Sequence, residues 1–186
     1  LTKIDVSETP ITDESAPFFA RCKSLRTAIL YSTRLGSGVV RELAKCPDLE
    51  VAMLSEMRIT DQDVTSLAAC RKLKQLYVRD CDLDGSFISA FKDHPALESL
   101  SLSGNSKLDD EDFAALMNLK HLKELDIGFT KGKPELLNQL ATLPRLKRIV
   151  ATGCKWPKEM IMQVEKTRPN LRILDFTVTM TVSWGG

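Results

Sequence analysis

Residues 49–81, LEVAMLSEMRITDQDVTSLAACRKLKQLYVRDC, hold a pattern that the rest of the chain repeats. The stretch opens with apolar residues in an L-x-x-L-x-L spacing, at Leu49, Ala52 and Leu54. The polar pair Thr60-Asp61 follows, then apolar residues three or four positions apart, and Leu73 starts the pattern again. Alternating apolar residues indicate a short strand, and the wider spacing indicates a helix. One unit therefore comprises a strand and a helix that returns beside it.

The first leucine of this unit recurs at nearly constant steps along the chain. The leading residues are Leu1, Leu25, Leu49, Leu73, Leu97, Leu122, Leu146 and Leu171. Subtraction of consecutive numbers gives steps of 24, 24, 24, 24, 25, 24 and 25 residues. Such a period is typical of a solenoid, in which each unit buries its apolar face by stacking on its neighbours. The unit resembles a leucine-rich repeat, which implies an α/β solenoid with a concave parallel β-sheet and convex helices.

The period predicts one array over residues 1–176, of about eight units with no linker between them. Residues 177–186 are predicted to form a C-terminal tail or irregular cap. Their apolar residues alternate with threonine and serine, which suits an extended segment folded over the open end of the array. A mobile remnant of a truncated repeat is the alternative. Because Leu1 already stands in register and is not Met, we expect a fragment or a processed chain.

Within each unit, the strand alternation divides the side chains between the core and the opposite face of the sheet. The core side is predicted for Ile4, Val6, Ala28, Leu30, Leu76, Val78, Leu100, Leu102, Leu125 and Ile127, and in the last unit for Leu174 and Phe176. Polar residues occur where helices are expected to begin, at Thr12-Asp13, Thr60-Asp61, Asp84 and Asp109-Asp110. We expect these residues to accept hydrogen bonds from the free N–H groups of the helices that they begin.

Three of the five cysteines share one position of the repeat. Cys22, Cys46 and Cys70 lie 24 residues apart, and His94 takes the next place in this column. Zinc needs four ligands around one point, whereas equivalent positions of stacked repeats form a row, so we reject a metal site. The cysteines are interpreted as small apolar side chains between helix and sheet, with reduced thiols. Reduced thiols favour an intracellular and specifically cytoplasmic location.

Residues 59–81, ITDQDVTSLAACRKLKQLYVRDC, resemble the cysteine-containing subfamily of leucine-rich repeats in their I-T-D turn and L-A-x-x-C helix end. Such repeats are well known from F-box proteins, where they bind substrates for ubiquitin ligases. The resemblance implies a protein–protein interaction module that binds a partner protein on its concave face. The alternative that it implies is a substrate-recognition or adaptor subunit of a larger enzyme complex such as a ubiquitin ligase. Bacterial and protozoan repeat proteins also carry I-T-D turns.

The sequence shows no arrangement of residues that predicts catalysis. His94 and His121 fall in helix-to-strand loops of different repeats, where we expect solvated side chains with no nucleophile in reach. The formal net charge is +1, and there is no apolar run long enough to span a bilayer. We therefore predict neither an enzyme nor a bound cofactor, and a protein partner instead of nucleic acid or membrane. The partner's identity and the oligomeric state stay open.

The binding surface is predicted on the concave face, where one column of residues lies between the inward strand positions. That column runs Asp5, Ile29, Met53, Tyr77, Ser101, Asp126, Val150 and Asp175. Its apolar stretch, with flanking residues, gives the predicted partner-binding set of Ile29, Tyr31, Val51, Met53, Tyr77 and Arg79, rimmed by Arg26, Glu56 and Asp80. An apolar patch with a charged rim is typical of protein-binding surfaces. The alternative is that β-branched and aromatic residues simply suit the surface of a sheet.

A second candidate region is basic and lies near the C-terminal end. It contains Arg145, Lys147, Arg148, Lys155, Lys158, Lys166, Arg168 and Arg172, against Glu159 and Glu165. These side chains suit an acidic partner or RNA, but no aromatic residues are interleaved to stack on bases. A solvated polar edge is the simpler interpretation.

Overall fold

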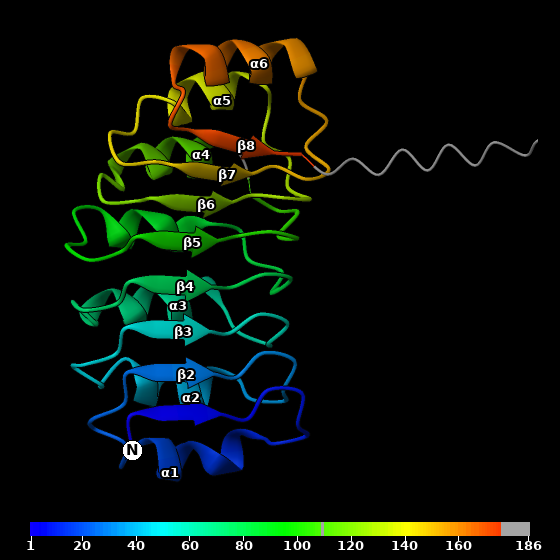
Figure 1. Ribbon diagram of the computed structural model, residues 1–186. Coiled ribbons are helices and arrows are strands. Elements are labelled where there is room, and N and C mark those ends of the chain that lie inside the picture. The colour runs from blue at the N-terminus through cyan, green and yellow to red at the C-terminus, as the bar shows by residue number, and fades with distance from the viewer. Residues whose placement is uncertain (109, 176–186) are drawn as a thin grey trace, which may run out of the picture.

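The computed structural model describes residues 1–108 and 110–175, in which short strands and helices alternate along one stack (Figure 1). The strands form one eight-stranded parallel sheet in chain order. They are β1 (Lys3–Asp5), β2 (Thr27–Ile29), β3 (Val51–Met53), β4 (Gln75–Tyr77), β5 (Ser99–Ser101), β6 (Glu124–Asp126), β7 (Arg148–Val150) and β8 (Arg172–Leu174). The predicted leucine-rich-repeat solenoid is confirmed. The predicted cap at 177–186 lies outside the described residues.

The returning halves of the units form α-helices and 3₁₀ helices (η), which cover one face of the sheet (Figure 1). They are η1 (Asp13–Ser15), α1 (Ala16–Phe19), α2 (Ser37–Leu43), α3 (Asp61–Ser66), η2 (Leu67–Ala69), η3 (Ser86–Phe91), α4 (Asp110–Ala115), η4 (Leu116–Asn118), α5 (Glu135–Leu140) and α6 (Lys158–Thr167). Helices this short are not stable alone in water, so packing of their apolar side chains against the sheet holds them in place. We call the uncovered side of the sheet the concave face.

The core is a continuous set of rows between sheet and helices. Leu25, Leu49 and Leu73 are fully buried, and each lies 24 residues from the next. The predicted inward residues of β1 to β6 are buried as well, except Val6, which is partly buried. Val6 belongs to the first repeat, which has no described neighbour on its outer side. Burial of one leucine contributes about 1.5–3 kcal/mol, so each repeat gains its stability largely from the repeats beside it.

The prediction for the last strand was wrong by one residue. Leu174, not Asp175, pairs with Val150 in the sheet, and Ile173 is buried in place of Leu174. β8 begins directly after Leu171, whereas Lys147 separates Leu146 from β7. A shift of one residue moves every side chain of a strand to the other face. Ile173 fills the core as Leu174 would.

The turn after each strand has the same backbone conformation throughout the described array. The residue at this position has a positive φ, from 51° to 57° at Glu8, Ser32, Glu56, Asp80 and Phe129, and 78° at Gly104 and Gly153. The next side chain donates to a carbonyl at the end of a strand in six of these seven repeats, as Thr33 Oγ1 does to Leu30 at 2.7 Å, and Met57 is the exception. Thr130 Oγ1 binds Ile127 at 2.6 Å, and Cys81 Sγ binds Leu54 at 3.2 Å. These bonds satisfy carbonyls that the ladder leaves free.

Asn105 occupies this turn position in the fifth repeat and is completely buried. Its amide nitrogen donates to the Val78 and Leu102 carbonyls, both at 2.8 Å. Its carbonyl oxygen accepts from the N–H groups of Cys81 at 3.1 Å and Leu83 at 3.0 Å. Both hydrogens and both lone pairs of the amide are thus used. One side chain fixes the turn of its own repeat and that of the repeat before it.

We predict that Asn105→Ala lowers the free energy of unfolding by roughly 2–4 kcal/mol, because four buried backbone groups lose their partner. Asn105→Thr should cost less, since the threonines at this position elsewhere bond to a strand carbonyl. Urea unfolding followed by circular dichroism measures both values. Equal losses for the two variants would contradict this assignment of the amide.

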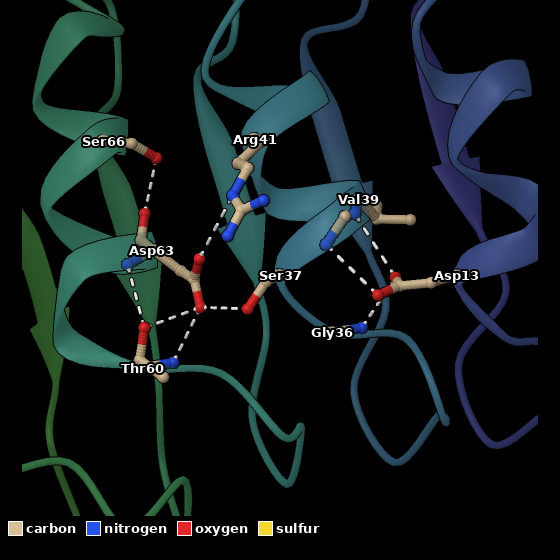
Figure 2. Close-up of polar contacts among 9 residues, drawn as sticks. Asp13, Gly36, Ser37, Val39, Arg41, Thr60, Asp63 and Ser66 are labelled. Atoms are coloured by element: carbon tan, nitrogen blue, oxygen red, sulfur yellow. Dashed lines mark hydrogen bonds and ion pairs between the residues drawn. The ribbon is translucent and has the colours of Figure 1, made fainter.

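Acidic side chains at helix starts connect neighbouring repeats (Figure 2). Asp13 accepts from the N–H groups of Gly36 at 2.9 Å, Gly38 at 3.1 Å and Val39 at 3.3 Å, all at the start of α2. We expected Asp13 to cap the helix of its own repeat, but it caps the helix of the next one. A Cβ atom at Gly38 would lie 3.0 Å from the Asp13 carboxyl carbon, so the small residue permits this approach. Asp61 bonds likewise to the N–H groups of Asp84 and Gly85.

Asp63 combines a cap within its helix with a contact to the preceding repeat (Figure 2). It accepts from the Thr60 N–H at 2.9 Å, while Thr60 Oγ1 accepts from the Asp63 N–H, which is a capping box. Ser37 Oγ donates to the same carboxylate at 2.5 Å. Burial alone would raise the pKa of Asp63, but the hydrogen bonds from Ser37 and Thr60 and the charge of Arg41 outweigh it and lower that pKa. The predicted cap by Thr60 is confirmed.

The cysteine column forms a buried row that ends in a histidine. Cys46 Sγ donates to the Cys22 carbonyl at 3.4 Å, and His94 Nε2 lies 3.1 Å from the Cys70 carbonyl. His94 Nδ1 accepts from the Leu97 N–H at 3.2 Å, which assigns the hydrogen to Nε2. His94 is only 3% exposed, so the expectation of a solvated histidine was wrong. The His94 ring contacts the carbonyl of the cysteine one repeat earlier, as Cys46 does, although His94 belongs to a loop.

Burial lowers the pKa of His94, and the charges of Arg71 and His121 act in the same direction, while the hydrogen bond to Cys70 opposes them. The unfolded chain therefore takes up a proton before the folded chain does. Stability that is fully present above the ordinary histidine pKa is lost as the pH falls below about 6.5.

We predict that His94→Cys, the residue of the column, makes the melting temperature less dependent on pH between about pH 7.5 and about pH 5.5. Thermal unfolding at several pH values measures this dependence. His121→Gln is the control, because that ring is only half-buried at the surface and bonds to Arg145. A pH dependence identical in His94→Cys and wild type would contradict the prediction.

Candidate partner-binding surface

The concave face presents the first and third residue of every strand, arranged in rows that cross the sheet. Ile29, Met53 and Tyr77 are direct neighbours in one row, because β2, β3 and β4 pair in that register. Val51 lies in the parallel row between Thr27 and Gln75. All the apolar members are partly exposed. The sheet therefore holds an apolar surface over β2 to β4 without covering it.

A hollow of about 410 Å³ opens in this surface, beside the ends of the strands. It is lined by Tyr31, Met53, Ser55, Glu56, Tyr77 and Arg79. We call it the concave hollow. Two tyrosine rings and a methionine give it apolar walls, and Glu56 and Arg79 bring one charge of each sign to it. Four of the six residues predicted for partner binding meet here, and the predicted rim residue Glu56 joins them.

The other predicted residues lie elsewhere. Ile29 and Val51 belong to the same apolar surface but do not line the concave hollow. Arg26 lies just before β2, where its Nε is 3.3 Å from Glu50 Oε1. Asp80 occupies a left-handed turn position and covers Gly104, where an added Cβ would lie 1.9 Å from Asp80 Oδ1. Of the three rim residues predicted from the sequence, only Glu56 lines the concave hollow.

A smaller polar hollow of about 170 Å³ adjoins the first and shares Tyr77 and Arg79 with it. Its other lining includes Ser99, Ser101 and Asp126. Ser101 Oγ donates to Asp126 Oδ2 at 2.8 Å, and the Tyr77 hydroxyl lies 3.3 Å from Ser99 Oγ. Prediction from sequence placed Ser101 and Asp126 on the concave face, in the column of Met53, but did not include them in the partner-binding set. Ser99 was not predicted there; it lies in the row of Val51 and Gln75.

Arg79 lies at the boundary between the two hollows and makes two contacts there. Its Nε lies 3.8 Å from Asp126 Oδ2, two strands away across the sheet. Its backbone N–H donates to Ser55 Oγ at 3.2 Å. The guanidinium group is half-exposed and retains donors that face solvent. A residue held in this way presents donors to a partner at low cost in side-chain entropy.

Among residues 1–108 and 110–175, no group of three His, Cys, Asp or Glu side chains lies close enough to hold a metal ion. The five thiols are free, and burial raises the pKa of Cys70 and that of Cys81 to about 11. Such thiols stay protonated at neutral pH and are poor nucleophiles. No helix in the described residues is long and apolar enough to cross a membrane.

Comparison with known proteins yields likeness of fold. No protein-family model and no curated protein sequence matches the chain. Internalin C2 of Listeria monocytogenes superposes with a TM-score of 0.67 at 18% identity, over 98% of this chain and 77% of that one. A chain from the crystal structure of the yeast Rad7–Elc1 complex gives a TM-score of 0.74 at 15% identity. That match covers 95% of this chain and half of the yeast chain.

Identities this low establish the architecture, which hosts many functions, and do not assign an activity. The solved chains that match number 138 in all, so the fold by itself selects no single role. The repeat of 24 or 25 residues, the parallel sheet in chain order and the helices on one face agree with these structures. The chain folds as a leucine-rich-repeat solenoid.

Proposed function

We propose that this protein is a non-enzymatic interaction module that binds a partner protein at the concave hollow. The observation that carries the proposal is the hollow itself, which gathers Tyr31, Met53 and Tyr77 around one depression of about 410 Å³. Apolar surface that is left in water on a rigid sheet gains free energy when a partner covers it. Tyrosine and arginine are the residue types that contribute most at protein interfaces.

The shape of the surface suits an anchor residue of the partner. The apolar walls favour an aliphatic or aromatic side chain, and the Arg79 guanidinium and Glu56 carboxylate offer hydrogen bonds to the adjoining backbone. The neighbouring polar hollow extends the contact toward Ser101 and Asp126. Sheet residues move little on binding, so the surface is organised before the partner arrives.

A second candidate function is a substrate-recognition or adaptor subunit of a larger complex such as a ubiquitin ligase. It is supported by the cysteine column, and by likeness to a chain from a structure in which Rad7 is assembled with Elc1. The five free thiols support a reducing, intracellular location, which we propose to be the cytoplasm. Both candidates use the same concave face, and they differ in whether the partner is delivered to an enzyme.

The experiment compares two double variants by quantitative affinity capture with mass spectrometry. Met53→Glu with Tyr77→Ala alters the concave hollow. Phe18→Ala with Met162→Glu changes two apolar residues that are 53% and 69% exposed but lie on the helices. We expect a specific partner to bind wild type and the helix variant equally, and the hollow variant roughly tenfold more weakly or worse.

Titration of the recovered partner against each purified variant gives the affinities. Circular dichroism confirms that the hollow variant keeps its fold. Equal affinity for the wild type and a folded hollow variant would contradict the proposed surface. Ubiquitin-ligase subunits that co-purify with every variant would favour the adaptor role.

A further inference from the structure

A row of charged residues runs across the sheet just before the strands. Its members are Arg26, Glu50, Lys74, Glu98, Lys123 and Lys147; Arg172, the first residue of β8, lies beside Lys147, to whose carbonyl its N–H donates. Each is adjacent to the next, because the N–H of each later residue donates to the carbonyl of the one before it. The distances run from 2.7 Å for Lys123 to Glu98 to 2.9 Å for Glu98 to Lys74. We call this row the charged edge; it is separate from the concave hollow.

Over the first repeats, the charged edge alternates in sign and its charges pair. Glu50 lies between two cations, 3.3 Å from Arg26 Nε and 2.6 Å from Lys74 Nζ. Hydrogen bonding to Lys74 lowers the pKa of Glu50. Glu98 continues the alternation and lies 2.7 Å from Lys123 Nζ. Neighbouring members of the charged edge are one strand apart, about 4.8 Å, so each carboxylate lies within reach of a cation on the adjacent strand.

The alternation ends at Lys123, since the next member, Lys147, is also a cation, and Arg172 of β8 beside it is another. Lys147 and Arg172 are exposed and make no ion pair within the part of the chain that the structure describes. The acids nearest to them already have partners: Glu124 binds Arg148 at 3.1 Å, and Glu165 accepts from the Ile173 N–H. Residues 176–186 contain no acidic side chain. Lys147 and Arg172 are therefore left without an ion-pair partner among residues 1–108 and 110–175.

Lys147 lines a hollow of about 520 Å³, together with Lys123, Arg145, Arg168 and Asn170 and with no acidic residue. Arg168 serves the fold, because its guanidinium donates to the carbonyls of Ala141, Leu143 and Leu146 after α5. Arg145 lies 3.2 Å from His121 Nδ1 and brings a further cation to the opening. The cations converge on one depression.

We propose that Lys123 and Lys147 of the charged edge, with Arg172 beside them, bind an acidic segment of a protein partner. Its carboxylates would pair with these cations as Glu50 and Glu98 pair with the cations of the earlier repeats. Alternate side chains of an extended peptide lie about 6.6 Å apart, within the reach of lysine and arginine side chains on adjacent strands. The lining has no aromatic ring on which a nucleic acid base would stack, so a peptide fits it better than RNA.

The test is fluorescence polarisation with a labelled peptide of alternating glutamate and serine, at low salt. Lys147→Glu with Arg172→Glu should weaken binding roughly tenfold or more, because attraction becomes repulsion. Raising the ionic strength to about 1 M should abolish wild-type binding, since the screening length falls to about 3 Å. Lys92→Glu with Lys131→Glu is the matched control, which changes the net charge equally at two exposed lysines outside the edge.

Three further measurements complete the test. Replacement of glutamate by glutamine in the peptide should abolish binding, and Met53→Glu with Tyr77→Ala should leave binding unchanged, which separates this site from the concave hollow. Thermal unfolding shows whether the charge-reversed protein is folded, and Lys147→Ala alone should give an intermediate affinity. The proposal is overturned if both charge-reversed pairs bind like wild type, if they weaken binding equally, or if oligouridylate binds the edge more tightly than the acidic peptide.

Discussion

Each repeat of this chain buries its leucines only by lying against the repeats on either side, and the parallel hydrogen-bond ladder sets how it lies there. The ladder keeps pairing residues 24 or 25 positions apart, from β1 to β8. Additional residues are inserted only at positions where they leave the hydrogen-bond ladder intact. One additional residue is accommodated between Asn105 and Leu108, and another is absorbed between α6 and β8. The core, the turns and the surface rows all follow from this pairing.

Because pairing is so regular, residues far apart in the sequence become lateral neighbours at a fixed spacing. The same device therefore builds very different surfaces from one backbone. Rows of leucine make the core, a row of Ile29, Met53 and Tyr77 makes an apolar face, and a row of alternating charge makes an edge of ion pairs. Exposed ion pairs add little stability each, so the charged edge contributes more to which molecules approach than to the fold.

The sequence alone predicted the solenoid, its strands and most of the core, because the leucine period is a direct record of stacking. It placed Met53 and Tyr77 side by side for the same reason. It did not predict that Ile29 would lie outside the hollow, since depth depends on how neighbouring side chains lean. The burial of His94 was not predicted because its place in a loop was given more weight than its place in the cysteine column. The shift of Leu174 was not predicted because Ile173 is equally apolar. The contact of Asp13 with the next repeat was not predicted because a cap across repeats leaves no local signal in the sequence.

The caps made by Asp13 and Asp61 give the array a direction. In both, a side chain of the earlier repeat holds the first N–H groups of the later one. On the ribosome the earlier repeat emerges first, so the acceptor for a helix start is already in place when that helix appears. Growth from the N-terminal side can then proceed one unit at a time, with each finished unit as the template for the next. Addition from the opposite end would leave these helix starts uncapped until the preceding unit had formed.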